Sequence, residues 1–118
     1  MTSEEVLRAF GQRLAVGDAA GAAALFAADA IYDEPPAHFE GREAIEGFIV
    51  DFAATHHDAD FTVLRALTRP DQVEAAAEWR WSYTRNADGE RRVFEGACFI
   101  TFRDGLIASW RGFSVRIN

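Results

Sequence analysis

The stretch from Val73 to Thr84, VEAAAEWRWSYT, alternates between two sets of side chains. The first set is small or aromatic, and the second is mostly charged or polar. The first consists of Ala75, Ala77, Trp79, Trp81 and Tyr83, and the second of Glu74, Ala76, Glu78, Arg80 and Ser82. Because successive side chains of a β-strand point to opposite faces of a sheet, this period of two predicts a strand with an aromatic inner face.

Three other segments of the second half have the same β-rich character. They cover residues 61–68, 91–102 and 106–117, and turn sequences separate all four segments. The turns are Arg69-Pro70-Asp71, Asn86-Ala87-Asp88-Gly89 and Arg103-Asp104-Gly105. Long strands joined by such turns predict an antiparallel meander of four strands.

The strand predicted at 91–102 is apolar on one side and half apolar on the other. The first side holds Phe94, Gly96, Cys98, Ile100 and Phe102, and the second holds Val93, Glu95, Ala97, Phe99 and Thr101. A sheet face that meets water is usually polar, so this outer face predicts a homodimer formed through the sheet. In the last strand the alternation is too weak to show which face Trp110 takes.

The first 60 residues have the spacing of helices. An apolar stripe at Val6, Leu7, Phe10 and Leu14 follows possible caps at Thr2 and Ser3, and Gly17 supplies a stop. Further helices are expected at 19–28, behind Asp18, and at 42–55, with a short extended piece at Ile31 and Tyr32 between them. Helices followed by a meander predict an α+β fold, with the helices covering one face of the sheet.

Composition narrows the classes of function. The 118 residues carry a net charge of −7, all 12 cations are Arg, and residues 1–60 hold 12 acids against three Arg. An acidic chain with scattered Arg and no Lys favours neither nucleic-acid binding nor Schiff-base chemistry. A single Cys excludes a disulfide framework and a Cys-based zinc site. We expect one domain over residues 1–118, without a cofactor or membrane contact, in the cytoplasm.

The segment Tyr32-Asp33-Glu34-Pro35-Pro36-Ala37-His38 places two carboxylates and a His around a rigid diproline. A carboxylate at the rim of an apolar pocket has a raised pKa, which suits a general acid or base. Either Glu34 or Asp33 could take this role, because a slip of one residue exchanges their faces. The alternative is that both carboxylates and His38 are solvated turn residues.

An aromatic set either fills a core or walls a cavity for a flat apolar ligand. Its members are Trp79, Trp81, Tyr83, Trp110, Phe48 and Phe52.

Other groups of residues give weaker indications of a functional site. His56 and His57 are expected as solvated residues at a helix end, not metal ligands, and Cys98 as an inert buried thiol. Arg80 and Arg111 are expected on the outer face of the sheet.

Several motifs, in this order along the chain, resemble the nuclear transport factor 2-like superfamily, and within it the SnoaL-like and ketosteroid-isomerase-like proteins. They are Gly17-Asp18, Ala24-Leu25-Phe26-Ala27-Ala28-Asp29-Ala30, Tyr32-Asp33-Glu34-Pro35, Gly41-Arg42-Glu43-Ala44-Ile45 and Phe102-Arg103-Asp104-Gly105-Leu106-Ile107. The resemblance implies a cone in which a curved antiparallel sheet wraps round three helices. It also implies a pocket at the open end and dimerisation through the sheet.

The resemblance places the ketosteroid-isomerase base on Glu34, the oxyanion-hole Tyr on Phe10 and the oxyanion-hole acid on Cys98. Neither Phe10 nor Cys98 is a strong hydrogen-bond donor, which argues against steroid isomerisation by that route. The hydrolase-like members use an Arg-x-Asp, for which this chain has Arg80-Trp81-Ser82. Only the minimal cyclase-like pattern with one pocket acid or base remains.

Three hypotheses follow. The first is an isomerase or cyclase in which Glu34 or Asp33 moves a proton on a flat apolar ligand. The second is a binding module without catalysis, and the third is a structural dimer whose cone is plugged by its own aromatic residues. The residues expected to contact a ligand are Phe10, Tyr32, His38, Phe48, Phe52, Trp79, Trp81, Tyr83, Cys98 and Trp110.

Overall fold

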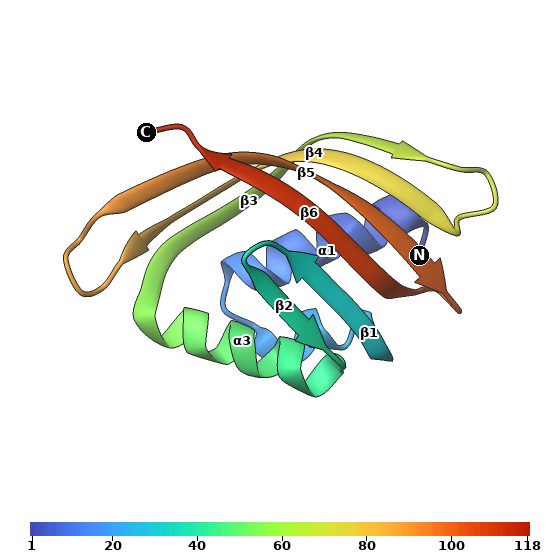
Figure 1. Ribbon diagram of the computed structural model, residues 1–118, viewed down its shortest axis with the longest axis horizontal. Coiled ribbons are helices and arrows are strands. Elements are labelled where there is room, and N and C mark those ends of the chain that lie inside the picture. The colour runs from blue at the N-terminus through green and yellow to red at the C-terminus, as the bar shows by residue number, and fades with distance from the viewer.

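The computed structural model describes all 118 residues and contains three helices and one six-stranded sheet (Figure 1). The helices are α1 (Ser3–Ala15), α2 (Ala19–Ala23) and α3 (Arg42–Thr55). The strands are β1 (Phe26–Glu34), β2 (Ala37–Glu40), β3 (His56–Thr68), β4 (Glu74–Arg85), β5 (Arg91–Arg103) and β6 (Leu106–Arg116). The α+β class is confirmed.

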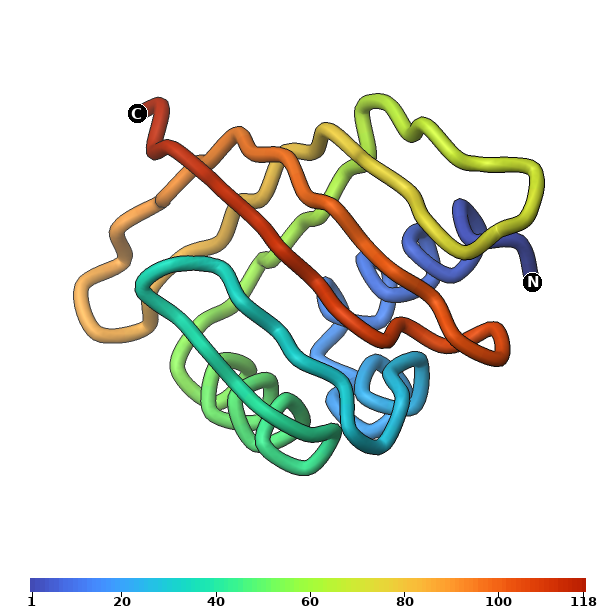
Figure 2. Tube along the Cα trace, turned by 45° about the vertical axis from the view of Figure 1, so that its right-hand side comes forward, coloured from blue at the N-terminus to red at the C-terminus, as the bar shows by residue number.

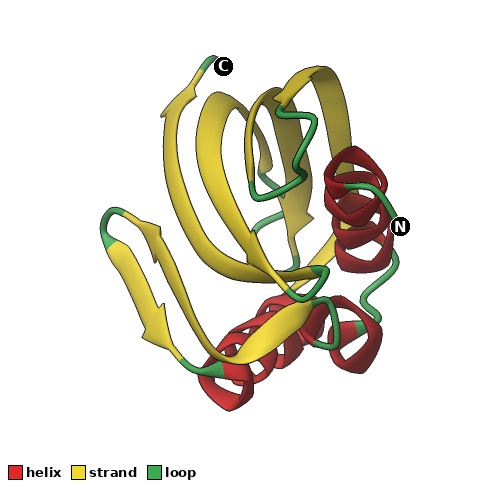
Figure 3. Ribbon diagram, turned by 90° about the vertical axis from the view of Figure 1, so that its right-hand side faces the viewer, coloured by secondary structure: helices red, strands yellow, loops and turns green.

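The sheet has the strand order β2-β1-β6-β5-β4-β3. Strands β3 to β6 form the expected antiparallel meander, and β1 joins it by pairing in parallel with β6. The sheet is strongly curved, and the helices lie on its concave side (Figure 3). This arrangement is the expected cone, in which side chains on the concave face of the sheet meet those of the helices.

Helix α1 is fixed at its start and buried along one stripe. Thr2 and Glu5 form a capping box, in which each side chain accepts a hydrogen bond from the backbone N–H of the other. The predicted stripe of Val6, Leu7, Phe10 and Leu14 is buried. Gly11 lets the helix approach the sheet closely, because a Cβ there would lie only 2.5 Å from the Phe61 ring.

The second helix is much shorter than expected: it ends at Ala23, not at Ala28. The chain is extended from Phe26 onward because β1 pairs with β6, and the N–H of Ile107 donates to the Leu25 carbonyl at 2.9 Å. Phe26 is fully buried in this position. Sheet pairing and burial therefore outweigh the helix propensity of the Ala-rich segment, which is a weak preference.

The short extended piece expected at Ile31 and Tyr32 belongs to a longer β-hairpin. Strand β1 has nine residues, and Pro35 and Pro36 form the turn to β2. The hairpin packs beside α3, at the edge of the sheet (Figure 2). Glu34 is therefore the last residue of a strand and has a defined face.

Strand β3 also starts earlier than expected, at His56 directly after α3. The reason is its pairing with β4, which begins at the pair His56 and Arg85.

Trp110 of β6 faces inward, as Ile107 does. A bulge opposite Thr101 and Phe102 shifts the alternation of inward and outward side chains along β6, so that both residues lie on the inner face. None of the three helices is both long and apolar enough to cross a membrane.

Candidate functional site

A cavity of about 290 Å³ lies between the helices and the concave face of the sheet. Eleven residues line it, and nine of them are hydrophobic. They are Phe10, Leu14, Tyr32, Glu34, Phe48, Phe52, His56, Phe61, Trp79, Trp81 and Tyr83. Glu34 is the one carboxylate among them, so an acidic group faces an aromatic interior. The aromatic set thus walls a cavity and also fills a core, in which Trp79 and Trp110 are buried.

Glu34 points from the end of β1 toward β6. The indole N–H of Trp110 donates a hydrogen bond to Glu34 Oε1 at 3.1 Å. A Cβ at Gly112 would overlap the same oxygen, so β6 leaves room for the carboxylate only because this residue is Gly. Burial raises the pKa of Glu34, although the hydrogen-bond donors Trp110 and Tyr32 act in the opposite direction. The carboxyl group therefore holds a proton more tightly than an ordinary Glu.

Tyr32 lies two residues before Glu34 on the same face of β1. Its ring stacks on Trp110, with centroids 5.5 Å apart and planes 16° from parallel. This stacking follows from the parallel register, which pairs Tyr32 with Trp110. Burial and the neighbouring Glu34 raise the pKa of Tyr32 well above 10, so its hydroxyl keeps its proton.

Asp33 lies between these two residues and points to the other face of the sheet. Its carboxylate forms an ion pair with Arg111, its partner in the β1–β6 register, and lies 3.7 Å from Nδ1 of His38. His38 is half exposed and lies 3.2 Å from the carboxylate of Glu40. Neither Asp33 nor His38 lines the cavity. The structure thus separates the two candidate carboxylates and brings Glu34 alone to the interior.

Two other expected ligand contacts lie behind the cavity wall. Cys98 is fully buried, and burial raises the pKa of its thiol to about 12. Trp110 is buried as well and reaches the site through its hydrogen bond to Glu34. At the oxyanion-hole positions that the resemblance implies, Phe10 offers the cavity an apolar ring and Cys98 does not line it.

Sequence reasoning missed three of the lining residues, Leu14, His56 and Phe61. Leu14 and Phe61 were expected only as members of a helix stripe and a strand. His56 was expected as a solvated residue, but its ring stacks on Phe52, with centroids 4.3 Å apart and planes 8° from parallel. The sequence at the junction of α3 with β3 contains no turn motif, so the inward position of His56 could not be predicted from it.

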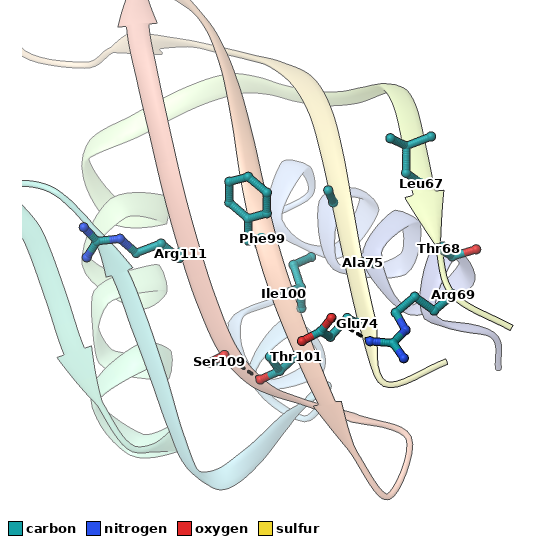
Figure 4. Close-up of a pocket in the computed structure, with 11 residues that line it drawn as sticks. Leu67, Thr68, Arg69, Glu74, Ala75, Phe99, Ile100, Thr101, Ser109 and Arg111 are labelled. Atoms are coloured by element: carbon teal, nitrogen blue, oxygen red, sulfur yellow. Dashed lines mark hydrogen bonds and ion pairs between the residues drawn. The ribbon is translucent and has the colours of Figure 1, made fainter. Parts of the chain in front are cut away.

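A second concavity, of about 480 Å³, lies on the outer face of the sheet (Figure 4). Its charged groups and two of its hydroxyls are paired with other side chains. Arg69 contacts Glu74 at 3.1 Å, and the hydroxyls of Thr101 and Ser109 are 2.5 Å apart. No three His, Cys, Asp or Glu side chains converge as metal ligands anywhere in the molecule. The charged groups of this groove are thus paired with opposite charges, whereas Glu34 in the interior cavity has only neutral hydrogen-bond donors.

The sequence model of the SnoaL-like domain matches residues 7–110. This chain belongs to the SnoaL-like domain family. The membership agrees with the cone-shaped fold and places the chain in the nuclear transport factor 2-like superfamily. A search of curated protein sequences finds no match to this SnoaL-like chain.

Solved structures share the fold at low sequence identity. A proposed polyketide cyclase of Pseudomonas putida is 21% identical, with a TM-score of 0.84 over 95% of this chain and 90% of that one. A protein of Catenulispora acidiphila with a ketosteroid isomerase-like fold is also 21% identical, with a TM-score of 0.81 over 92% and 83% of the two chains. An epoxide hydrolase of Mycobacterium tuberculosis is 15% identical, with a TM-score of 0.83 over 96% and 82%. These similarities establish the shared fold.

Proposed function

We propose that this SnoaL-like protein binds a flat, largely apolar small molecule in the interior cavity and that Glu34 transfers a proton on it, as in an isomerase or cyclase. The observation that carries the proposal is a single desolvated carboxylate facing a cavity walled by aromatic rings. Perturbed titratable groups in apolar pockets are typical of functional sites. The aromatic walls favour a conjugated ligand that stacks on them.

In this mechanism the Glu34 carboxylate takes a proton from a carbon of the ligand and the resulting acid returns it at a second position. The raised pKa of Glu34 favours proton transfer near neutral pH, because a general base works best when its pKa lies close to the working pH. The hydrogen bond from Trp110 fixes the carboxylate, and Tyr32 supplies a neutral hydroxyl beside it.

The same cavity restricts the substrate. Phe10 and Cys98 stand where the resemblance implies oxyanion donors, and the loss of one such donor costs on the order of 10²- to 10³-fold in rate. A substrate that delocalises its own negative charge needs these donors least. We therefore favour a 1,3-dicarbonyl compound attached to an aromatic ring, a chemistry found in polyketides, over a simple ketone.

Epoxide hydrolysis is less well supported by this site. Arg80 belongs to the segment that corresponds to the Arg-x-Asp of the hydrolase-like members. It pairs with Glu95 on the outer face of the sheet at 3.0 Å. The cavity lining contains no Arg and no second carboxylate that could activate water beside Glu34. Binding without catalysis is the second candidate function, and it is favoured by the lack of a strong donor at the two oxyanion positions, Phe10 and Cys98.

The test uses benzoylacetone, whose keto and enol forms differ in ultraviolet absorbance, and compares Glu34→Gln with the matched control Asp33→Asn. We expect wild-type protein to accelerate keto–enol interconversion, and Glu34→Gln to lower that rate by about 100-fold or more. Asp33→Asn should stay within a few-fold of wild type. Tryptophan quenching without acceleration would support the binding module, and equal rates for Glu34→Gln and wild type would exclude the role of Glu34.

A further inference from the structure

His56 lies where the interior cavity meets the molecular surface. A groove of about 220 Å³ at the ends of α1 and α3 adjoins the cavity. Leu14, Phe52 and His56 line both hollows, so these three side chains form the wall between them. Of the three, only His56 carries a polar group, and a ligand that entered from this groove would pass it.

The imidazole of His56 is held in one orientation by aromatic contacts. It stacks on Phe52, and the ring of Tyr83 meets it edge to face at 4.8 Å and 85°. Both neighbours line the cavity as well. The ring is therefore positioned before any ligand arrives, which lowers the entropic cost of using it for binding.

Hydrogen bonding also fixes the tautomer. Nδ1 of His56 lies 3.1 Å from the Phe52 carbonyl oxygen and 2.9 Å from the Thr55 hydroxyl. A carbonyl can only accept, and the Thr55 hydroxyl donates its own hydrogen to the Asp51 carbonyl at 2.9 Å. Nδ1 therefore carries the hydrogen in the neutral ring, and Nε2 is left as an acceptor.

Nε2 of His56 has no partner in the protein. It is also not buried, because the one buried side-chain nitrogen or oxygen without a partner is Trp79 Nε1. A fixed imidazole with a free and accessible acceptor thus lies at the border between the cavity and the groove. An imidazole nitrogen without a hydrogen accepts a hydrogen bond from a hydroxyl or amine donor, and a hydroxyl on an aromatic ring fits the aromatic walls.

We infer that His56 is a specificity-determining residue whose Nε2 accepts a hydrogen bond from a hydroxyl of an aromatic ligand in this cavity. The inference rests on the proposed function, since it adds a second polar contact to the site of Glu34. Glu34 acts on one part of the ligand, and His56 selects for a hydroxyl on another part. The preferred substrate class is therefore a hydroxylated aromatic compound.

The test compares 2-naphthol with 2-methoxynaphthalene, which has the same ring system but no hydrogen to donate, by isothermal titration calorimetry. We expect wild-type protein to bind 2-naphthol about fivefold more tightly, the effect of one hydrogen bond. His56→Phe, which keeps a ring for stacking, should lose this preference and still bind 2-methoxynaphthalene. His57→Phe alters the neighbouring His, which does not line the interior cavity, and should keep the preference.

A second measurement, imidazole ¹⁵N shifts of the wild-type protein, does not depend on the folding of a variant. It should show Nδ1 protonated in the free protein, and a shift of Nε2 when 2-naphthol binds. Equal affinity for the two probes, or an Nε2-protonated ring, would overturn the role of His56 and leave the proposed function intact. Failure of wild-type protein to bind either probe would overturn both.

Discussion

Asp33 and Glu34 are consecutive carboxylates on β1 that meet opposite surroundings. Asp33 lies on the outer face of the sheet, where Arg111 neutralises it and water reaches it. Glu34 lies on the inner face, where its contacts are neutral donors and aromatic rings. An ion pair with Arg gives a carboxylate an electrostatic partner, whereas neutral donors leave its charge poorly compensated. The difference shows that the side of the sheet, not the residue type, decides which carboxylate is suited to proton transfer.

The same contrast holds for the large apolar residues. Trp79 on the inner face is 1% exposed, whereas Phe99 on the outer face is 62% exposed. The charges near Phe99 are paired within the chain: Arg111, its partner in the β5–β6 register, forms an ion pair with Asp33. The inner face therefore consists of a packed core and a cavity that can hold a ligand. The outer face exposes apolar side chains, and its charges are paired within the single copy of the chain.

Trp79→Ala should produce the largest change in the free energy of unfolding. Truncation of a fully buried Trp costs about 3–5 kcal/mol, because its packing is lost and a cavity remains. Urea unfolding monitored by circular dichroism measures this cost. Val16→Ala is the control, since Val16 is 80% exposed and should change stability by less than about 0.5 kcal/mol. A loss below about 1 kcal/mol for Trp79→Ala would show that the inner face is not a packed core.

Phe99→Asp tests the outer face. We expect a second copy of the chain to cover this face, because a two-fold axis places like surfaces together and the paired charges do not repel. A central aromatic residue of such an interface contributes about 2 kcal/mol or more. Sedimentation should show dimers of the wild-type protein and of Val16→Asp, and monomers of Phe99→Asp. A wild-type protein that sediments as a monomer would contradict this expectation.

Gly112→Ala should disturb Glu34 without removing it. The added Cβ would overlap Glu34 Oε1 and lie 2.7 Å from Trp110 Nε1, so the carboxylate has to move and its hydrogen bond is lost. Overpacking of this kind costs about 1–3 kcal/mol. Gly47→Ala is the opposite control, because nothing lies within 4 Å of its Cβ and helix α3 should gain about 0.5–1 kcal/mol. Equal stability of Gly112→Ala and wild type would mean that Glu34 is not held against β6.

The alternation of residues 73–84 was enough to predict the inner aromatic face, because a period of two has one structural interpretation. The Ala-rich segment was predicted incorrectly as a helix up to Ala28. Its strand depends on pairing with β6, about 80 residues away in sequence, and local propensity contains no information on that contact. Of the residues expected to contact a ligand, Tyr32, Phe48 and Phe52 line the cavity, while His38 lies on the other side of the hairpin.

The choice between Asp33 and Glu34 could not be made from sequence for the same reason. It is set by the register of β1 against β6, which places Asp33 beside Arg111 and Tyr32 beside Trp110. His56 was missed because its position depends on β3 starting directly after α3. Both failures concern long-range pairing, whereas helix α1 and strand β4, which were predicted from clear local periodicity, are found in the structure.

The pH dependence of stability gives the smallest effect and the most direct test of the contrast between the two carboxylates. Because burial raises the pKa of Glu34, the folded protein holds this proton more tightly than the unfolded chain does. The stability that protonated Glu34 contributes is thus fully present below the ordinary pKa of Glu. It is lost as the pH rises toward the raised pKa of Glu34 in the folded protein. Glu34→Gln cannot ionise, so its stability relative to wild type should increase over that window. Urea unfolding between pH 4 and pH 8 measures this difference, with Glu43→Gln as the control for loss of an exposed carboxylate. A constant difference between Glu34→Gln and wild type would mean that Glu34 is as well solvated as a surface residue.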